Sequence, residues 1–296
     1  MRKMKIGIVT KNPKSWCSTQ LIKAINRKKA EPLCLKFSEI TAKVRIKPYA
    51  TIKNQKNLLE EVSALIIRPI GKGSLEEIIF RIDLLHKLER LGLPIINSPK
   101  AIERTVDKYY SLALLEEAGL PVPRTIVTEN PAQALEAFHE LGGDVVVKPL
   151  FGSRGVGSTR VSDAEIATRI FKALAYNHEV IYLQEFIQHG FSDIRAFVIG
   201  ENVIAAMKRV AQTWKTNISQ GAKPVPIKLS QELEELAVKA AETLKCQIAG
   251  VDIIQSQEGP LIVELNSQPG WRGLQTITKV NIADKIVEYV ISQLKR

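Results

Sequence analysis

The chain has 296 residues, of which 45% are hydrophobic and 25% charged, and its 42 Lys and Arg against 31 Asp and Glu give a net charge of +11. Such a chain can form two or three globular domains. It has no apolar run of the roughly 20 residues that span a bilayer. The apolar stretch after the basic start MRKMK is too short for a signal peptide, so we expect the first strand of a cytoplasmic protein there. Its basic residues are dispersed without an aromatic-interleaved motif, which argues against a nucleic acid as the partner. The positive charge would equally attract a polyanionic small molecule such as a nucleotide. Cys17, Cys34 and Cys246 are far apart and form no C-x-x-C pair, which favours a reducing, cytoplasmic location over a disulfide framework.

The first hundred residues alternate strand and helix patterns. Strands are expected at KIGIVT, EPLCLKF, VSALIIRP and LPIINSP, and helices at STQLIKAINRK and SLEEIIFRIDLLHKLERLG. This order predicts a doubly wound α/β domain over residues 1–100. The first turn, KNPKSW, lacks the G-x-G-x-x-G fingerprint, which argues against a dinucleotide-binding domain.

The remaining two thirds of the chain mix helices with antiparallel strand patterns. A helical pattern in PKAIERTVDKYYSLALLEEAGL is followed by the strands TIVT, DVVVKPL and YLQEFI and by two more helices. Next come a hairpin in DIRAFVIGENVIAAMKRV, a helix in SQELEELAVKAAETLKC, the strands AGVDIIQS and PLIVELNS, and a C-terminal helix. We expect two further domains, at residues 101–187 and 188–296.

The last two predicted strands each carry an acid inside an apolar run. Asp252 lies in AGVDIIQ and Glu264 in LIVELN, and Asn266 shares a strand face with Glu264 because positions two apart point the same way. Burying a carboxylate costs several kcal/mol of folding free energy unless a partner compensates its charge. An antiparallel hairpin would bring the three oxygen donors together, which favours Mg²⁺ or Mn²⁺. The alternative is that each acid pairs with a buried arginine.

Two lysines and a glycine-rich loop suggest a phosphate site. Lys148 lies within the strand DVVVKPL, which otherwise looks buried, and the loop FGSRGVGSTRV follows it. Backbone N–H groups of such a loop can surround phosphate oxygens while a lysine supplies positive charge. A second lysine, Lys108 in TVDKYYS, sits near the start of a helix. The loop is not a Walker A motif, so a mobile surface turn and a solvated helix face remain the alternatives.

Taken in order, these segments resemble the RimK-type ATP-grasp ligases. The resemblance is carried from about residue 90 onward by NSPKAIERTVDKYYSLALLEEAGLPVPRT, VVVKPLFGSRGVGSTRV, YLQEFI, SDIRAFVIG, AAMKR, TNISQGA, GVDII and VELNSQPG. It implies an α+β protein with the ATP-grasp fold, in which an N-terminal doubly wound pre-ATP-grasp domain precedes two α+β domains that clamp ATP. It also implies that ATP activates a carboxylate as an acyl phosphate, which an amine attacks to give an amide.

The resemblance also implies roles for individual positions. ATP would be contacted by Lys108, Lys148, Ser153, Gly155, Gly157, Ser158, Gln184, Glu185, Phe186, Ile187, Asp193 and Lys208. The metal ligands would be Asp252, Glu264 and Asn266, with Glu264 bridging two Mg²⁺ or Mn²⁺ ions. The candidate catalytic residues are Arg195, Arg209 and Asn217. The arginines would neutralise the transferring phosphate, and the alternative for them is a surface salt bridge.

Two departures bear on the substrate. Where ribosomal-protein-modifying members have arginines, WKTNISQGA has Lys215 and Gln220, and SQPGWRGLQ also differs. These segments are more similar to the branch that attaches L-glutamate to a pterin or deazaflavin coenzyme, the tetrahydromethanopterin:glutamate ligases. Trp271 and Trp214 could stack on a flat ring and Arg272 could hold a carboxylate, or the loop could simply pack over the core.

Other readings remain open at this point. The acceptor could instead be the tail of a ribosomal protein or an amino-group carrier protein, since a basic surface suits an acidic partner. A non-catalytic ATP-binding protein is a third possibility, against which the retained lysines, arginines and metal ligands argue. The resemblance further implies a homo-oligomer, either a dimer or a tetramer.

Overall fold

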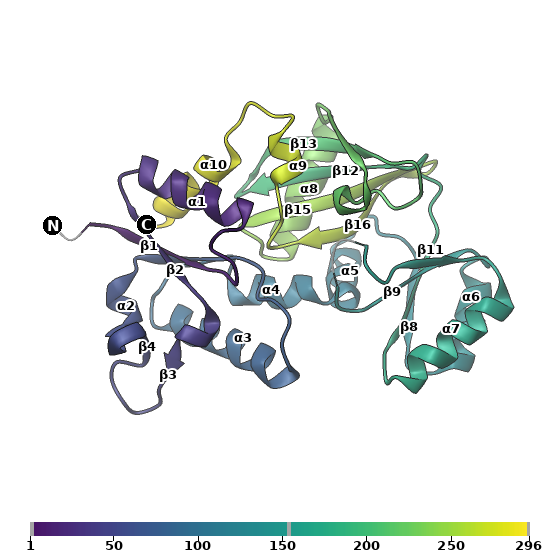
Figure 1. Ribbon diagram of the computed structural model, residues 1–296. Helices are drawn as coiled ribbons and strands as arrows, with labels where there is room; N and C mark the ends of the chain where they lie inside the picture. The colour runs from purple at the N-terminus through teal and green to yellow at the C-terminus, as the bar shows by residue number, and fades with distance from the viewer. Residues whose placement is uncertain (1–2, 153–154, 295–296) are drawn as a thin grey trace.

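The computed structural model describes residues 3–152 and 155–294, and its N-terminal part is built on a four-stranded parallel sheet (Figure 1). The sheet has the order β2-β1-β6-β7, with β1 at Lys5–Val9, β2 at Glu31–Leu35, β6 at Ala64–Ile67 and β7 at Ile95–Ile96. Helix α1 (Trp16–Arg27) covers one face and α3 (Leu75–Arg90) the other. This confirms the doubly wound pattern, in which strand order reverses between β1 and β6.

Local signals explain where these helices begin. Ser15 caps α1 by accepting a hydrogen bond from the backbone N–H of Ser18, and Ser74 forms a capping box with Glu77 at the start of α3. The sequence patterns missed a small sheet of β3 (Thr41–Ala42), β4 (Ala50–Ile52) and β5 (Lys56–Asn57), with helix α2 (Leu58–Glu61) beside it. Strands of two or three residues are too short for alternation to reveal them.

The middle of the chain forms an antiparallel sheet joined to the first by two helices, α4 (Pro99–Val106) and α5 (Lys108–Glu117). Its order is β10-β9-β11-β8, with the bounds Thr159–Val161, Val145–Lys148, Ile181–Glu185 and Thr125–Thr128. Helices α6 (Pro131–Glu140) and α7 (Ala164–Tyr176) bury one face of it, at the right of Figure 1. The other face is left for the site described below.

The last part is a five-stranded antiparallel sheet of order β14-β13-β12-β15-β16. The bounds are Lys223–Pro226, Asn202–Val210, Ser192–Ile199, Ile248–Ser256 and Gly259–Asn266. Helices α5 and α8 (Gln231–Thr243) pack on one face, and α9 (Arg272–Gln275) and α10 (Ile282–Gln293) on the other. The predicted hairpin of β15 and β16 is confirmed, and it pairs Asp252 directly with Glu264.

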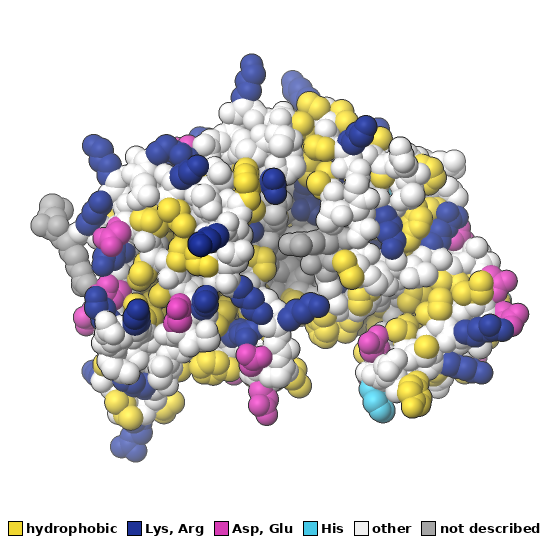
Figure 2. Space-filling model, in the orientation of Figure 1, with side chains coloured by type: hydrophobic (Ala, Val, Ile, Leu, Met, Phe, Trp, Pro, Cys, Tyr) yellow, Lys and Arg dark blue, Asp and Glu magenta, His cyan; other side chains and the backbone are white. Residues whose placement is uncertain are grey.

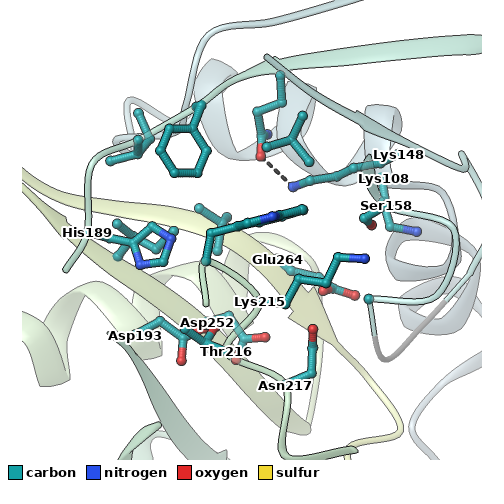
Figure 3. A pocket seen from close by; sticks show the side chains of 18 of the residues that line it. Lys108, Lys148, Ser158, His189, Asp193, Lys215, Thr216, Asn217, Asp252 and Glu264 are labelled. Atoms are coloured by element: carbon teal, nitrogen blue, oxygen red, sulfur yellow. Dashed lines mark hydrogen bonds between the residues drawn. The ribbon is translucent and has the colours of Figure 1, made fainter. Parts of the chain in front are cut away.

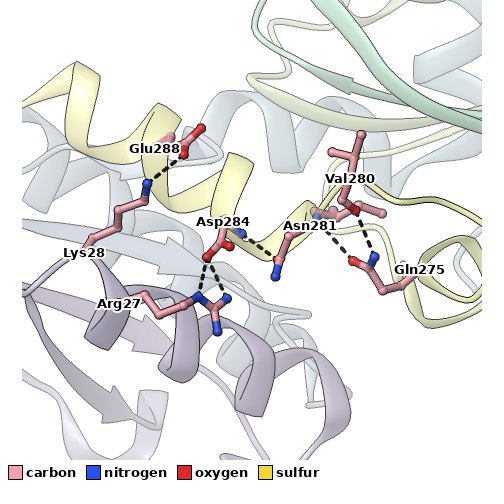
Figure 4. A network of polar contacts seen from close by, with 8 residues as sticks. Arg27, Lys28, Gln275, Val280, Asn281, Asp284 and Glu288 are labelled. Atoms are coloured by element: carbon pink, nitrogen blue, oxygen red, sulfur yellow. Dashed lines mark hydrogen bonds and ion pairs between the residues drawn. The ribbon is translucent and has the colours of Figure 1, made fainter.

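The C-terminal helix fixes the last sheet to the first. Helix α10 packs against α1, where Arg27 donates to Asp284 at 2.6 Å and Lys28 to Glu288 at 2.7 Å (Figure 4). After β7, the buried side chain of Asn97 accepts hydrogen bonds from the backbone N–H groups of Gln247 and Ile248 and donates to the carbonyl of Ile248. The carboxyl end of the parallel sheet is therefore held beside β15. In the described ranges, no helix is both long and apolar enough to cross a bilayer.

Candidate functional site

A cavity of about 900 Å³, including the space at its open mouth, lies between the middle sheet and the C-terminal sheet (Figure 3). In the space-filling view, Lys and Arg side chains surround the hollow in the middle of the visible face (Figure 2). The described residues that line the cavity are Lys108, Val146, Lys148, Pro149, Gly152, Gly155, Val156, Ser158, Gln184, Glu185, Phe186, Ile187, His189, Asp193, Arg209, Trp214, Lys215, Thr216, Asn217, Asp252, Ile254, Val263 and Glu264.

Two lysines enter the cavity from different elements. Lys108 opens helix α5, and its Nζ donates to the backbone carbonyls of Leu150 at 3.2 Å and Gly152 at 3.1 Å. Lys148 ends β9, and its Nζ donates to Oε1 of Gln184 on β11. Enclosure lowers the pKa of both lysines, against the attraction of Glu264, and the pKa of Lys148 falls to about 8. Two cations held close together without enough counter-charge form a site for an anion.

Glu264 is the carboxylate that faces these lysines (Figure 3). Its side chain is half-buried and, within the described part of the chain, makes no hydrogen bond or ion pair. Its neighbour across the hairpin, Asp252, has a different environment, because Arg195 donates to both of its oxygens and Arg209 lies 3.0 Å from one of them. Of the two predicted metal ligands in the cavity, only Glu264 lacks a partner of its own.

The arginines form a buried network with two acids. Arg209 also forms a bidentate pair with Asp193, which accepts a further hydrogen bond from Oγ1 of Thr216 at 2.7 Å. Burial opposes ionisation of Asp252, but the two arginines override it and hold the pKa of that carboxyl below its usual range. The alternative that the sequence left open, pairing of an acid with buried arginines, therefore holds for Asp252.

The other end of the cavity is apolar enough for a purine ring. Val146, Ile254 and Val263 line it, and Phe186 meets Trp214 edge-on with ring centroids 6.3 Å apart. Gln184 and Glu185 end β11, Ile187 follows it, and all three line the cavity, while their contact with ATP stays a prediction. The carboxylate of Glu185 is engaged by Arg124 at 2.7 Å, so only its backbone is available to a ligand.

The glycine-rich loop contacts the opposite wall directly. Gly155 has a φ of +69°, and a Cβ placed on it would overlap Oδ1 of Asn217. Ser158 also lines the cavity. Gly157 has a φ of +81° but is not part of the lining, and Ser153 lies outside the described residues. The glycine-rich loop and the segment around Asn217 therefore meet at the wall of the cavity.

Several predicted site residues lie elsewhere. Lys208 is exposed on the other face of β13 from Arg209, because neighbouring strand residues point in opposite directions. Asn266 and Arg195 are not among the lining residues, although Arg195 reaches the site through Asp252. Arg272 is exposed and also outside the cavity.

The predicted stacking role of Trp271 is wrong for this structure. The side chain is 1% exposed and packs in the core against Trp16 and Phe197, with ring centroids 6.2 Å apart in each case. Packing of the loop over the core, the alternative reading, is what is found. Trp214, by contrast, does line the cavity.

Sequence patterns missed other residues of the lining. Val146, Ile254 and Val263 look like core positions in apolar strands, and nothing in the sequence separates a ligand-facing valine from a core valine. His189 lies in a loop without a distinctive motif, and Thr216, although part of the segment WKTNISQGA, was given no role. Burial lowers the pKa of His189, against the attraction of Asp193, which favours the neutral ring.

The donor set fits magnesium together with phosphate. Within the described ranges, no three His, Cys, Asp or Glu side chains gather into a metal-binding group, and the cavity offers the carboxylates of Glu264 and Asp252. Mg²⁺ is commonly bound by one or two carboxylates with the remaining ligands from substrate phosphates and water. Hard oxygen donors beside two lysines therefore suit a magnesium–nucleotide complex.

The lowered pKa of Lys148 predicts a pH dependence of nucleotide affinity. Its positive charge is present below pH 8 and is lost as the pH rises through about 8. We expect the Kd for ADP to be level from about pH 6.5 to 7.5 and to rise by up to about tenfold per unit above pH 8. Calorimetric titration across this range measures the profile. The variant Lys148→Met should bind weakly at every pH, and a level profile in the unaltered protein would contradict the assignment.

Gly155→Ala should weaken ATP use because the new methyl group overlaps the carboxamide of Asn217 and a left-handed φ suits glycine. We expect kcat/KM for ATP to fall by about tenfold, which corresponds to roughly 1.4 kcal/mol. The matched control is Gly157→Ala, since that residue shares the left-handed φ but its Cβ would meet only Pro149, at 3.3 Å. Equal losses in the two variants would show that backbone strain, and not the contact with Asn217, is responsible.

Comparisons with known proteins agree with this architecture. Residues 105–290 match the RimK-like ATP-grasp domain and residues 4–102 the RimK PreATP-grasp domain. The tetrahydromethanopterin:alpha-L-glutamate ligase of Methanocaldococcus jannaschii is 35% identical over 99% of this chain and all of that protein. The enzyme of the same name from Methanosarcina acetivorans is 34% identical over 97% and 98%.

Solved structures share the fold at lower identity. The ATP-grasp ligase PsnB, in complex with a minimal precursor, Mg and ADP, has a TM-score of 0.76 and 21% identity, covering 99% of this chain and 98% of that one. A RimK domain protein from Sphaerobacter thermophilus has a TM-score of 0.75 and 20% identity, covering 96% and 98%. The ATP-grasp fold expected from the sequence is thereby confirmed.

Proposed function

Because the chain belongs to the RimK-like ATP-grasp family, we propose that it is an ATP-dependent ligase that joins the amino group of L-glutamate to a carboxylate of a pterin coenzyme of the tetrahydromethanopterin type. The observation that carries the proposal is the cavity in which Lys108 and Lys148 face the unpaired carboxylate of Glu264. The near full-length similarity to two ligases of that name supports the choice of substrates.

The proposed reaction has two steps. The acceptor carboxylate attacks the γ-phosphorus of ATP, and the bond between that phosphorus and the β-phosphate oxygen breaks. The products of this step are ADP and an acyl phosphate. The glutamate amine then attacks the acyl carbon, phosphate departs with the C–O bond pair, and the amine loses a proton to give the amide. No protein nucleophile is needed, so the chain contributes position and charge.

The residues of the cavity divide these tasks. Lys108 and Lys148 would neutralise phosphate oxygens, the loop around Gly155 would exclude water, and the ring edge of adenine would meet the backbone after Gln184. Glu264 and Asp252 would hold Mg²⁺ or Mn²⁺, and we propose two ions, which supply further neutralisation of phosphate charge when bound. Arg195 and Arg209 would hold Asp252 ionised and fixed in direction.

The proposal is tested by supplying ATP, Mg²⁺, L-glutamate and tetrahydromethanopterin together and measuring ADP release and product mass. We expect ADP release to require both substrates and the product to gain one glutamyl residue or more. A parallel reaction offers a peptide with an acidic carboxyl-terminal tail in place of the coenzyme. ADP release that needs neither substrate, or that occurs only with the peptide, would reject the coenzyme assignment.

A further inference from the structure

Outside the nucleotide cavity, one buried side chain lacks the partner that its charge demands. Arg68 follows β6 directly, and its backbone N–H donates to the carbonyl of Val9 at 2.9 Å, so it lies where the ladder of β1 and β6 ends. This is the carboxyl edge of the parallel sheet at the point where strand order reverses, which is where doubly wound sheets bind ligands.

Arg68 differs from the other buried arginines in its counter-charge. Among the described residues, Arg68, Arg81 and Arg209 are the buried arginines, with exposures of 9%, 8% and 4%. Arg81 pairs with Glu77 at 2.8 Å, and Arg209 pairs with Asp193 and Asp252. Within the same described ranges, no carboxylate pairs with Arg68, whose Nη1 donates only to the backbone carbonyl of Pro269 at 3.2 Å. A buried guanidinium without an anion is costly, so a missing anion is the simplest explanation.

The segment that Arg68 contacts offers further donors without acceptors. The guanidinium lies 4.9 Å from the ring centroid of Trp271. The indole Nε1 of Trp271 and the amide Nε2 of Gln268 are buried and have no hydrogen-bond partner. Trp16, the first residue of α1, packs against Trp271. One small region therefore combines a guanidinium, two neutral donors and the positive end of a helix, and no described acid pairs with it.

This region adjoins the nucleotide cavity through β15. A Cβ placed on Gly250 would lie 2.9 Å from both Nη1 of Arg195 and Cβ of Pro269, so those two side chains meet over this residue. Arg195 in turn holds Asp252, which lines the cavity opposite Glu264. The surroundings of Arg68 are therefore linked to the wall of the nucleotide cavity through Pro269, Arg195 and Asp252.

We propose that Arg68, together with the indole of Trp271 and the amide of Gln268, binds a substrate carboxylate that is not the one being activated. The guanidinium fork matches the two oxygens of a carboxylate, and the bound anion supplies the missing counter-charge. The inference rests on the proposed ligase function and assigns Arg68 a positioning role in it. The carboxylate belongs either to L-glutamate or to the coenzyme acceptor, and the kinetics below distinguish the two.

The test compares the same substitution at two equally buried arginines. We expect Arg68→Lys to raise the KM for one substrate, L-glutamate or tetrahydromethanopterin, by at least about tenfold, because an ammonium group cannot make the bidentate contact. The KM for ATP should stay within about twofold. Arg81→Lys, at an arginine whose charge Glu77 already balances, should leave all three KM values unchanged. If Arg68→Lys lowers the melting temperature but moves no KM, the role is structural and the proposal is overturned.

A second measurement does not depend on turnover. L-glutamate and tetrahydromethanopterin are each added alone, together with ADP and Mg²⁺. We expect one of the two to raise the melting temperature of the unaltered protein but not that of Arg68→Met, whose side chain fills the space without the charge. Equal shifts in both proteins would overturn the proposal. If the unaltered protein forms no product but this arginine-dependent shift is present, the proposed function fails while the carboxylate site stands.

Discussion

Glu264→Gln is expected to lower the rate of ADP formation by about a hundredfold to a thousandfold or more, while leaving the free energy of unfolding within about 1 kcal/mol. The amide has the shape of the carboxylate but no charge with which to hold a divalent ion. Stability should not change greatly because, among the described residues, none forms a hydrogen bond or ion pair with this side chain. A coupled assay of ADP and a denaturant titration measure the two quantities.

The matched control for this variant lies in the same hairpin. Glu258→Gln makes the same change at an exposed turn residue between β15 and β16, away from the cavity. It should leave both turnover and stability unchanged. Substantial turnover by Glu264→Gln would remove the basis for its role in the reaction.

Asp252→Asn is expected to destabilise the folded protein by about 3–5 kcal/mol. Asp252 is 2% exposed and is the acid that Arg195 and Arg209 share, so removal of its charge leaves the buried Arg209 and the mostly buried Arg195 with, among the described residues, only Asp193 to balance them. Urea titration should show a lower midpoint with an unchanged m-value. An unchanged midpoint would mean that the network does not depend on this carboxylate.

The two acids stand opposite each other on one rung of the β15–β16 ladder, so the two variants form a natural comparison. Stability should depend mainly on Asp252, whereas turnover should depend on both acids, since both would hold Mg²⁺. Arginines pair with Asp252, whereas Glu264 faces the lysines of the cavity without pairing with them.

Much of the fold was predictable because local sequence patterns determine the helices and strands. Alternating strands and helices gave the parallel sheet, and an acid in each of two apolar runs indicated the hairpin that brings Asp252 and Glu264 together. The pairing of Asp252 was not predictable, since its partners come from β12 and β13 and only the folded sheet brings them within reach. Arg68 was missed for the same reason, because its burial depends on a loop some two hundred residues away, at Pro269.

The proposed function requires that Glu264 holds the divalent ion that accompanies the nucleotide. Calorimetric titration of ADP with and without Mg²⁺ tests it in the unaltered protein and in Glu264→Gln. We expect Mg²⁺ to tighten ADP binding to the unaltered protein by at least about tenfold, roughly 1.4 kcal/mol, and to have no such effect on the variant. Equal tightening in both proteins would contradict the claim.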